Sequence, residues 1–591
     1  MQFFKNVLST VVGLFLFCFL FFIIIIIIGV MAAAGSSSSN DVVKVEDNSV
    51  IELDLEDVTD DYSGSFKYTD FSLLDHTYNE GLVDVLRALD HAKTDSRIKG
   101  ITLTNSNASL GMAQSKALRD KLEEVKKAGK FVVAYSDAYS QRDYYLNSVA
   151  DTLYLNPAGE LEFKGLSSEV LFFKDFQDKT GVKMEVIRHG KYKSAVEPFL
   201  SNEMSEANRQ QITELLNSVW ASVAEDISKS RKIPVATLNN IADSLGARTP
   251  ERAKAVKLID KIGYQDEYEN GIKKALSLRK TEEFNTVDVL DYVKATLGEV
   301  QANTFTNDIV AIIYAQGDIN GGEGDVNVIG EESIRRAFKE ALADDGVKAI
   351  VLRVDSPGGS ALTSELIWRE VELAKKRKPV VVSMGNYAAS GGYYISCGAD
   401  RIFAEPNTIT GSIGVFGALP NLTGLANKVG IHAEEVSTHA NATGYSVFTP
   451  LKESTRGYIT EDIEDVYQTF VSRVAAGRKM SPEAVDAIAQ GRVWSGSEAL
   501  KVGLVDELGG LDKAVAHAAK LAKSKKYGTL DYPVYEKEFG DMFKGLGFAK
   551  TKEELIKEEV GAEAYEVMQR IKRISQLKGA QAAMPYEINI R

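Results

Sequence analysis

The sequence predicts an α/β protein of two tandem, homologous units behind an N-terminal transmembrane helix. Three observations support this fold class: an uncharged apolar run near the start, strand-like apolar runs that alternate with helical patterns, and one constant offset that relates the two halves. The chain has 591 residues, which exceeds the size of a single hydrophobic core. We therefore expect more than one domain.

The N-terminal run predicts a membrane anchor. No charged residue occurs from Val7 to Ala34, and roughly 20 apolar residues suffice to cross a bilayer. A cleaved signal peptide is the alternative, because Ala32–Ala34 resembles a cleavage site, but the apolar core of a signal peptide spans only about 7–15 residues. Lys5 precedes the run and acidic residues follow it, so the positive-inside rule predicts a cytoplasmic N-terminus. We expect a single-pass protein of the inner (plasma) membrane whose bulk is periplasmic or otherwise extracytoplasmic.

Composition argues against several classes of partner. The formal net charge is −14, and no basic cluster offers a face to nucleic acid. The two cysteines, Cys18 and Cys397, are not expected to pair, and no Cys/His cluster has metal-ligand spacing. The glycine-rich loops lack the spacing of a nucleotide-binding loop. We expect no nucleic acid, metal or other cofactor.

An internal repeat is the most informative pattern. A shift of 249 residues superposes Ile350–Arg353 on Ile101–Thr104 and Tyr393–Tyr394 on Tyr144–Tyr145. The same shift holds further along the chain. Later, a shift of 246 superposes Leu504–Asp506 on Leu258–Asp260, and Gly509 on Gly263. Two copies of this length indicate a duplication and not a solenoid.

The repeat and the composition divide the chain into segments. A Gly/Ser stretch after the apolar run is typical of a flexible linker. The predicted segments are residues 1–34 as cytoplasmic stub and anchor, 35–48 as linker, 49–300 as first unit, 301–525 as second unit, and 526–591 as a charged tail.

Each unit reads as strand, loop, helix, strand, helix. In the second unit the pattern predicts a buried strand at Val347–Val354, a helix from Ala361 to about Lys376, a strand at Pro379–Met384 and a helix beginning near Ser390. Glycine-rich loops follow both strands, at the position where α/β folds bind ligands.

Ser390 is the candidate nucleophile. It would lie at a strand-to-helix turn, where the amide of Gly391 and its neighbours stabilise developing negative charge. Gly358 and Gly359 would supply a second donor to such an oxyanion hole. On spacing alone the simpler interpretation is favoured, in which Ser390 caps the helix and the glycines form turns.

A serine nucleophile needs a base, and the residues alone do not identify it. No motif ties any of the six histidines to Ser390: His76, His91, His189, His432, His439 and His517. Lysine serves as a base if burial lowers its pKa toward neutrality. Composition does not indicate which lysine.

Several motifs resemble one family. Tyr192–Phe199 resembles the lysine motif of the long, duplicated bacterial form of signal peptide peptidase A. Further segments resemble the serine half of that family: Ser356–Gly359, Ala389–Tyr393, Thr410–Gly414, and Gly491–Trp494 followed by Gly503–Asp506. The resemblance extends in matching order from the anchor to about residue 525. The tail beyond carries no motif of the family.

The resemblance implies a membrane-anchored serine endopeptidase with Ser390 as nucleophile and Lys193 as general base and acid. Ser412 would orient the lysine amine, and Lys191, the nearest rival base, would be solvated. The resemblance further implies Clp-protease/crotonase-like ββα units, a homotetramer, and substrates that are cleaved signal peptides or other extended apolar peptides.

The repeat supports this assignment independently. At the shift of 249, Ser390 aligns with Gln141 and Lys193 with Ala442, so each unit lacks what the other supplies. The glycine pair also has no counterpart, since it aligns with Ser109–Leu110. We expect the site at the seam between the units and within one chain. Independent drift of the two units is the alternative.

Two other functions remain open from the sequence. A crotonase-type acyl-CoA enzyme also uses paired backbone amides, but it needs acidic catalytic residues and seldom carries an anchor. A non-catalytic membrane scaffold would retain neither reactive motif. A fluorophosphonate that labels Ser390 discriminates the protease from both.

Overall fold

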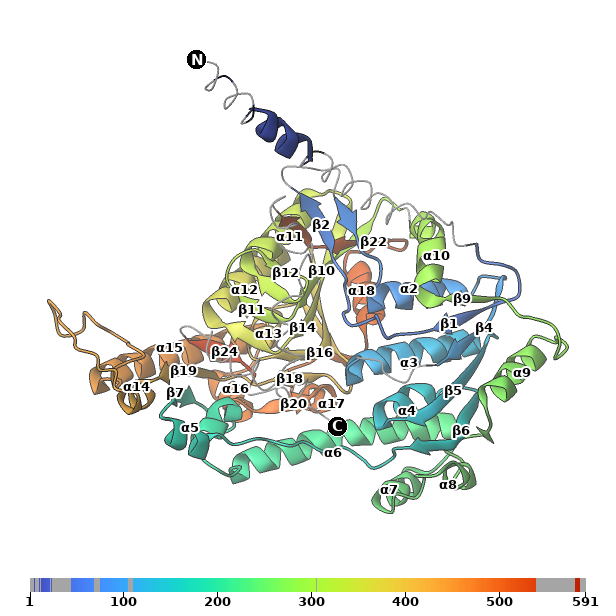
Figure 1. The fold of residues 1–591 in the computed structure, drawn as a ribbon, viewed down its shortest axis with the longest axis horizontal. Helices are drawn as coiled ribbons and strands as arrows, with labels where there is room; N and C mark the ends of the chain where they lie inside the picture. The colour runs from blue at the N-terminus through green and yellow to red at the C-terminus, as the bar shows by residue number, and fades with distance from the viewer. Residues whose placement is uncertain are drawn as a thin grey trace.

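The computed structural model describes residues 44–68, 75–104, 110–304, 306–537 and 580–584, with part of the segment between residues 5 and 23. The fold is mixed α/β, and helices cover the faces of the sheets (Figure 1). The predicted anchor lies mostly outside the described residues. Within the described part, no helix combines the length and the apolarity needed to span a bilayer.

The first unit is built on a parallel sheet of order β8-β6-β5-β4-β1-β9. Its strands are short and mainly apolar, as expected when helices cover both faces of a parallel sheet. The strands are β1 (Ser49–Leu53), β4 (Ile98–Leu103), β5 (Phe131–Tyr139), β6 (Thr152–Leu161), β8 (Lys261–Ile262) and β9 (Thr286–Asp288).

The second unit repeats this arrangement in the order β20-β18-β16-β14-β10-β22, with β17 on β16 and β21 on β17. Its two longest strands match the predicted ones, although β16 runs five residues further, up to Ser390. The strands are β10 (Ile309–Gln316), β14 (Val347–Ser356), β16 (Val380–Ala389), β17 (Arg401–Ala404), β18 (Ile409–Gly411), β20 (Val493–Ser495), β21 (Glu507–Leu508) and β22 (Gly528–Tyr532).

Matching contacts confirm that the chain is duplicated. Tyr144 Oη donates to Leu258 O at 2.9 Å, and at the predicted offsets Tyr393 Oη donates to Leu504 O, also at 2.9 Å. In both units the tyrosine ring is buried. An equivalent long-range hydrogen bond is therefore present in the core of each unit.

Helices pack on both sheets. The first unit carries α2 (Leu82–Ala92), α3 (Met112–Lys127), α4 (Gln141–Asn147), α5 (Lys174–Thr180), the 3₁₀ helix η2 (Ser194–Phe199), α6 (Glu206–Arg231), α7 (Val235–Asp243), α8 (Pro250–Ala255), α9 (Gln265–Ala275) and α10 (Val289–Thr304). The second carries α11 (Glu331–Ala343), α12 (Ala361–Lys375), α13 (Gly391–Ser396), α14 (Thr423–Lys428), α15 (Glu453–Arg478), α16 (Pro482–Ile488), α17 (Gly496–Lys501) and α18 (Leu511–Leu521).

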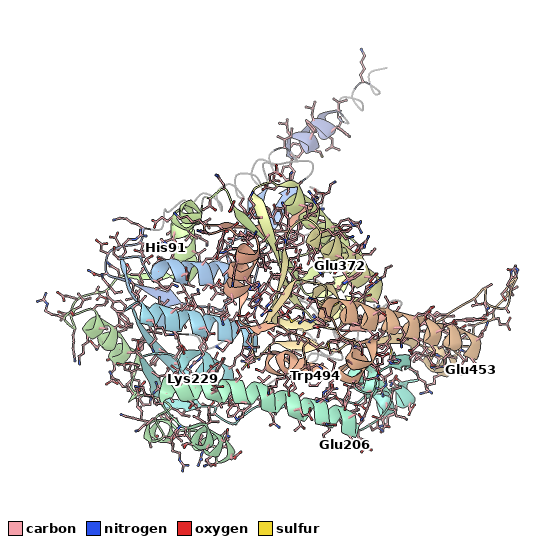
Figure 2. All side chains as sticks on the ribbon, turned by 180° about the vertical axis from the view of Figure 1, so that it is seen from behind. His91, Glu206, Lys229, Glu372, Glu453 and Trp494 are labelled. Carbon is pink, nitrogen blue, oxygen red and sulfur yellow. The ribbon has the colours of Figure 1, made fainter. Side chains whose placement is uncertain are left out.

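Helix α6 links the two units. It runs along one side of the molecule from Glu206, passes below Trp494 of the second unit and reaches Lys229 beneath the first sheet (Figure 2). Ser218 of α6 shares a hydrogen bond of 2.6 Å with Ser495 of β20. The helix thus packs on both units.

Buried polar contacts hold the seam between the units. Arg353 of the second unit donates to Asp61 of the first at 2.7 Å, and both side chains are almost fully buried. Asn386 Oδ1 accepts from the amides of Ala113 and Gln114 at 3.1 and 3.2 Å, so it satisfies two amides at the start of α3. These contacts fix the units relative to each other close to the Ser390 turn.

A third sheet crosses the seam in the order β12-β13-β11-β15-β24-β19-β7. Strand β7 of the first unit pairs antiparallel with β19 of the second over seven residues. The strands are β7 (Lys183–His189), β11 (Asp318–Asn320), β12 (Gly324–Asp325), β13 (Val328–Gly330), β15 (Gly358–Ser360), β19 (Val415–Asn421) and β24 (Gln581–Ala583).

The segment assigned to the tail contributes strands to three sheets. Besides β24 in the third sheet, β22 pairs with β10 in the second. The smallest sheet joins β2 (Ser65–Tyr68), β3 (His76–Thr77) and β23 (Val534–Lys537). The sheet of the second unit therefore continues past the boundary expected at residue 525.

Candidate active site

Lys193 is positioned by strand β7 and the turn that follows it. The strand ends at His189, and Lys193 lies at the N-cap position of η2. Arg188 Nη1 donates to Lys193 O at 2.9 Å, while the amide of Tyr192 donates to Gln490 O at 2.8 Å. Because β7 pairs with β19, this turn is held against the second unit.

The amine of Lys193 lies between two serines. Its Nζ is 2.9 Å from Ser390 Oγ, 3.1 Å from Ser412 Oγ and 3.1 Å from Ser412 O. The lysine side chain is completely buried. Burial lowers the pKa of Lys193 well below its ordinary value, and no acidic neighbour contributes to the shift. The amine is therefore neutral at a lower pH than an exposed lysine, as a base must be.

Two glycines make room for the lysine. A β-carbon on Gly491 would stand 2.6 Å from Lys193 Cβ, and one on Gly414 would stand 3.2 Å from Lys193 Cδ. Gly491 also has a φ of 79°, which disfavours any other residue. The backbone of the second unit thus forms the wall of the lysine pocket. Both glycines lie in segments that resemble the family's motifs, but those motifs do not indicate this role.

Ser390 follows β16 in a strained conformation, with φ 55° and ψ −113°. Its amide donates to Gly411 O at 2.8 Å. Ser390 occupies the N-cap position of α13, yet its side chain makes no capping hydrogen bond. Helix capping therefore does not account for this serine. Its hydroxyl is turned toward Lys193. A strained backbone conformation of this kind costs of order 1–3 kcal/mol.

The predicted oxyanion glycines lie together beside Ser390. A β-carbon on Gly358, whose φ is 102°, would stand 2.7 Å from Gly391 N, so the two glycine loops are in contact. The amide of Gly358 donates to Ser356 Oγ at 3.1 Å, whereas Gly359 pairs across the third sheet. The glycine positions are thus required by close approach of backbones.

Ser412 lies between β18 and β19 with a φ of 50°. Its amide donates to Arg492 O at 2.7 Å, which fixes the residue against the segment just before β20. The side chain is completely buried. Ser412 thus offers Lys193 both a hydroxyl and a carbonyl oxygen, which hold the amine near Ser390.

Other candidates do not reach this site. In the described part of the chain, Ser390 Oγ has hydrogen-bond partners in Lys193 and, at 3.5 Å, Gly414 O, and no histidine among them. Lys191 is exposed. The described residues also contain no group of three or more potential metal ligands.

One strand beside the site could not be expected from the sequence. Strand β24, from the C-terminal tail, pairs antiparallel with β15 and so lies along the glycine loop. The tail carries no motif and its strand is only three residues long. No local pattern indicated this pairing.

The geometry suits acyl transfer. A neutral, buried amine within hydrogen-bonding distance of a hydroxyl accepts its proton as that oxygen attacks a carbonyl carbon. The start of α13 and the glycine loop are in contact beside Ser390, and backbone amides at such a place can stabilise an oxyanion. No cofactor is needed for this chemistry.

Comparison with known proteins identifies the relatives of the chain. Residues 124–279 and 372–525 each match the model of peptidase family S49. Protease 4 of Haemophilus influenzae is 38% identical over 456 residues, which cover 75% of this chain and 73% of that protein. The chloroplastic serine protease SPPA of Arabidopsis thaliana is 32% identical over 468 residues, or 77% and 68% of the two chains.

Among solved structures, a ClpP1 mutant from Listeria monocytogenes matches 37% of this chain and 98% of its own at 16% identity, with a TM-score of 0.25. That score is too low to assign the fold of the units.

Proposed function

The chain belongs to peptidase family S49 and is a serine protease, and on that premise we propose that Ser390 is its nucleophile and Lys193 its general base. The observation that carries the proposal is the buried amine of Lys193, 2.9 Å from Ser390 Oγ, with its pKa lowered by burial. Lys193 belongs to the first unit, in which Ser390 has no counterpart. Ser390 belongs to the second unit, in which Lys193 has no counterpart.

The proposed reaction has two stages. Neutral Lys193 takes the proton of Ser390 as Oγ attacks the peptide carbonyl carbon, and the protonated amine then donates to the leaving nitrogen. An ester to Ser390 results. Water repeats the sequence on that ester, with Lys193 again accepting and returning the proton.

Surrounding groups stabilise this reaction. The amides of Gly391 and Gly359 are the proposed oxyanion donors, while Gly358 gives the space in which a substrate backbone approaches. Ser412 holds the amine through the contacts at 3.1 Å. The neutral amine has two N–H donors and one lone pair, and it needs such partners for its donors to keep the lone pair directed at Ser390.

We propose that the protease acts at a membrane on extended apolar peptides, including cleaved signal peptides. The uncharged run of Val7–Ala34 supports an anchor. Clp-protease/crotonase-like units and a homotetramer belong to the same proposal, and their support is the resemblance of the motifs.

The alternatives fit less well. A crotonase-type enzyme would not require a lysine against Ser390, and a scaffold would not maintain a completely buried amine, which costs stability when protonated.

The test is hydrolysis of a synthetic signal peptide by the detergent-solubilised full chain, followed by mass spectrometry of the products. We expect cleavage that is lost in Ser390→Ala. Turnover of acyl-CoA without peptide hydrolysis would favour the crotonase function, and inactivity toward both would favour the scaffold.

A further inference from the structure

We infer that Asp355 is a positioning residue of the protease, whose ionised carboxylate joins the glycine loop to the loop that carries Ser390. Because Ser390 and Lys193 are taken as nucleophile and base, this role rests on the proposed function. Asp355 touches no reacting atom in this role and acts through the backbone of β16. Activity then requires the ionisation of a second group besides Lys193.

Asp355 lies at an interruption between β14 and β16, the neighbouring strands that lead to the active site (Figure 1). Their pairing shifts register between Val354 and Ser356, and there the three residues Gly385–Tyr387 of β16 lie opposite Asp355 alone. A bulge disrupts the ladder of backbone hydrogen bonds and redirects the chain, and bulges are common next to active sites. Ser390 follows only three residues after Tyr387, so the conformation of this bulge determines where the nucleophile lies.

The carboxylate of Asp355 supplies hydrogen-bond acceptors to the bulge. Its Oδ1 accepts from the amide of Tyr387 at 2.9 Å, and its Oδ2 accepts from Asn386 Nδ2 at 3.3 Å. The fit is close, since a β-carbon on Gly385 would stand 2.7 Å from Oδ2. Each carboxylate oxygen therefore holds one donor of the loop that leads to Ser390.

The side chain of Asn386 requires an acceptor at this place. Its Oδ1 already accepts from the amides of Ala113 and Gln114 at the start of α3, so its Nδ2 is the end that faces Asp355. A protonated carboxyl group carries an O–H donor on one oxygen, and this donor would replace an acceptor for either Nδ2 or the amide of Tyr387. Only the ionised carboxylate accepts at both oxygens.

The link connects the two loops of the proposed site and the seam between the units. On one side Asp355 precedes Ser356, whose Oγ accepts from the amide of Gly358 at 3.1 Å. On the other side the bulge leads to Ser390, and Asn386 contacts the first unit. Loss of the carboxylate would therefore loosen the glycine loop and the serine turn relative to each other. Misplacement of a reacting group by about 1 Å can cost about 10²-fold in rate.

The surrounding charges determine the pH at which Asp355 ionises. Burial raises the pKa of Asp355 to about 7, and the negative charge of Asp61 across the seam adds to this rise. Arg353 on β14 opposes it, as do the backbone amides that donate to the carboxylate. Glu405 at the end of β17 also acts on Arg353, and Lys116 of α3 acts on Glu405. The link is therefore complete above about pH 7 and is lost as pH falls below this value.

The pH dependence of kcat/KM tests this role, because it reports the ionisations of the free enzyme. The wild type must lose one proton from Lys193 and one from Asp355 to become active. On the acid side, log kcat/KM should therefore rise with pH at a slope of about two. Asp355→Asn has nearly the same shape but no ionisation, so its slope should fall to about one. Its kcat should fall by up to about 10²-fold while KM changes little.

Two further variants serve as controls. Asp345→Asn makes the same change at an exposed position, and it should keep both the rate and the slope of the wild type. Glu405→Gln removes the neighbouring carboxyl group whose pKa burial also raises to about 7, and it should keep the slope of about two. Circular dichroism at each pH confirms that the proteins compared are folded. The wild-type slope needs no substitution, so the test does not depend on the folding of a variant.

A wild-type slope of one overturns the inference, as does an unchanged slope in Asp355→Asn. A slope that falls in Glu405→Gln and not in Asp355→Asn assigns the second ionisation to Glu405 and also overturns it. In each of these cases, hydrolysis that is lost in Ser390→Ala leaves the proposed function standing. Hydrolysis that survives in Ser390→Ala removes the proposed function, and the role of Asp355 with it.

Discussion

Lys193 Nζ lies 2.9 Å from Ser390 Oγ, although 197 residues separate the two in the chain. The contact exists because β7 and β19 pair across the seam and carry the lysine turn onto the second unit. The proposed site thus takes one residue from each unit of the duplicated chain.

Ser390→Ala should lower kcat for peptide hydrolysis by about 10⁴-fold or more, as loss of a nucleophile does in other serine hydrolases. The fold should persist, because a small side chain is removed. Ser396→Ala is the matched control: this serine is also buried in α13, and it donates to Gly392 O at 2.7 Å. Steady-state kinetics with circular dichroism checks both variants, and comparable losses in the two would contradict a special role for Ser390.

Lys193→Arg should be as inactive as Lys193→Ala, since a guanidinium does not lose its proton in proteins. Lys191→Ala should retain near wild-type kcat/KM because that lysine is exposed. Hydrolysis assays on the three variants measure this. Substantial activity in Lys193→Arg would rule out proton transfer by this residue.

The pH dependence follows from the direction of the Lys193 pKa. Burial lowers this pKa below its usual value of 10.5, so the amine becomes a competent base as pH rises through the lowered value. We expect kcat/KM to be still climbing on the alkaline side of pH 7. A plateau near pH 6.5, where an unperturbed histidine has lost its proton, would contradict a lysine base.

The same shift affects stability. Because the folded pKa lies below the unfolded one, the unfolded chain binds more protons, and stability rises with pH between the two values. Lys193→Met removes this penalty. Its melting temperature should exceed that of the wild type most at low pH, and the difference should shrink as pH approaches 10.5. A difference that does not change with pH would contradict a neutral buried amine.

Ser412→Ala should lower kcat by about 10²-fold while KM changes little, since misplacement of a reacting group has effects of this size. Ser412→Gly separates the hydroxyl from the backbone, because φ at this position is 50° and glycine adopts it freely. Equal losses in both variants, measured by steady-state kinetics, identify the hydroxyl as the positioning group. Retention of activity in the glycine variant would assign the effect to the backbone.

The seam should depend on the buried ion pair between Arg353 and Asp61. Asp61→Ala leaves a buried cation unpaired and should cost about 3–5 kcal/mol of stability. The double variant Asp61→Ala, Arg353→Met should be destabilised less. Asp57→Ala, an exposed change nearby, should stay within about 0.5 kcal/mol. Denaturant titration measures all three, and a small effect of Asp61→Ala alone would contradict the role of the pair.

The duplication could be predicted from the sequence because one offset relates the two halves, and the two proposed catalytic residues could be named because their motifs resemble those of one family. Strand-like apolar runs, glycine-rich loops and the offset of 249 residues are visible when the chain is aligned with itself. The motif around Lys193 also marks the turn that the structure places beside Ser390. Strained turns, and glycines whose backbone touches another segment, can be recognised in a sequence because few residue types are compatible with such positions.

The pairing of distant strands could not be predicted in this way. Strand β24 is three residues long, and β7 and β19 pair between segments more than 200 residues apart. Such ladders depend on main-chain hydrogen bonds, which carry little sequence information. For the same reason Gly491 was recognised only as part of a motif, and its contact with Lys193 came from the structure.

The most direct test of the central claim is labelling with a fluorophosphonate, followed by peptide mapping of the labelled chain. We expect the wild type to be labelled at Ser390 alone and faster as pH rises, and Lys193→Ala to be labelled little or not at all. Labelling at another serine, or undiminished labelling of Ser390 in Lys193→Ala, would contradict a Ser390 nucleophile activated by Lys193.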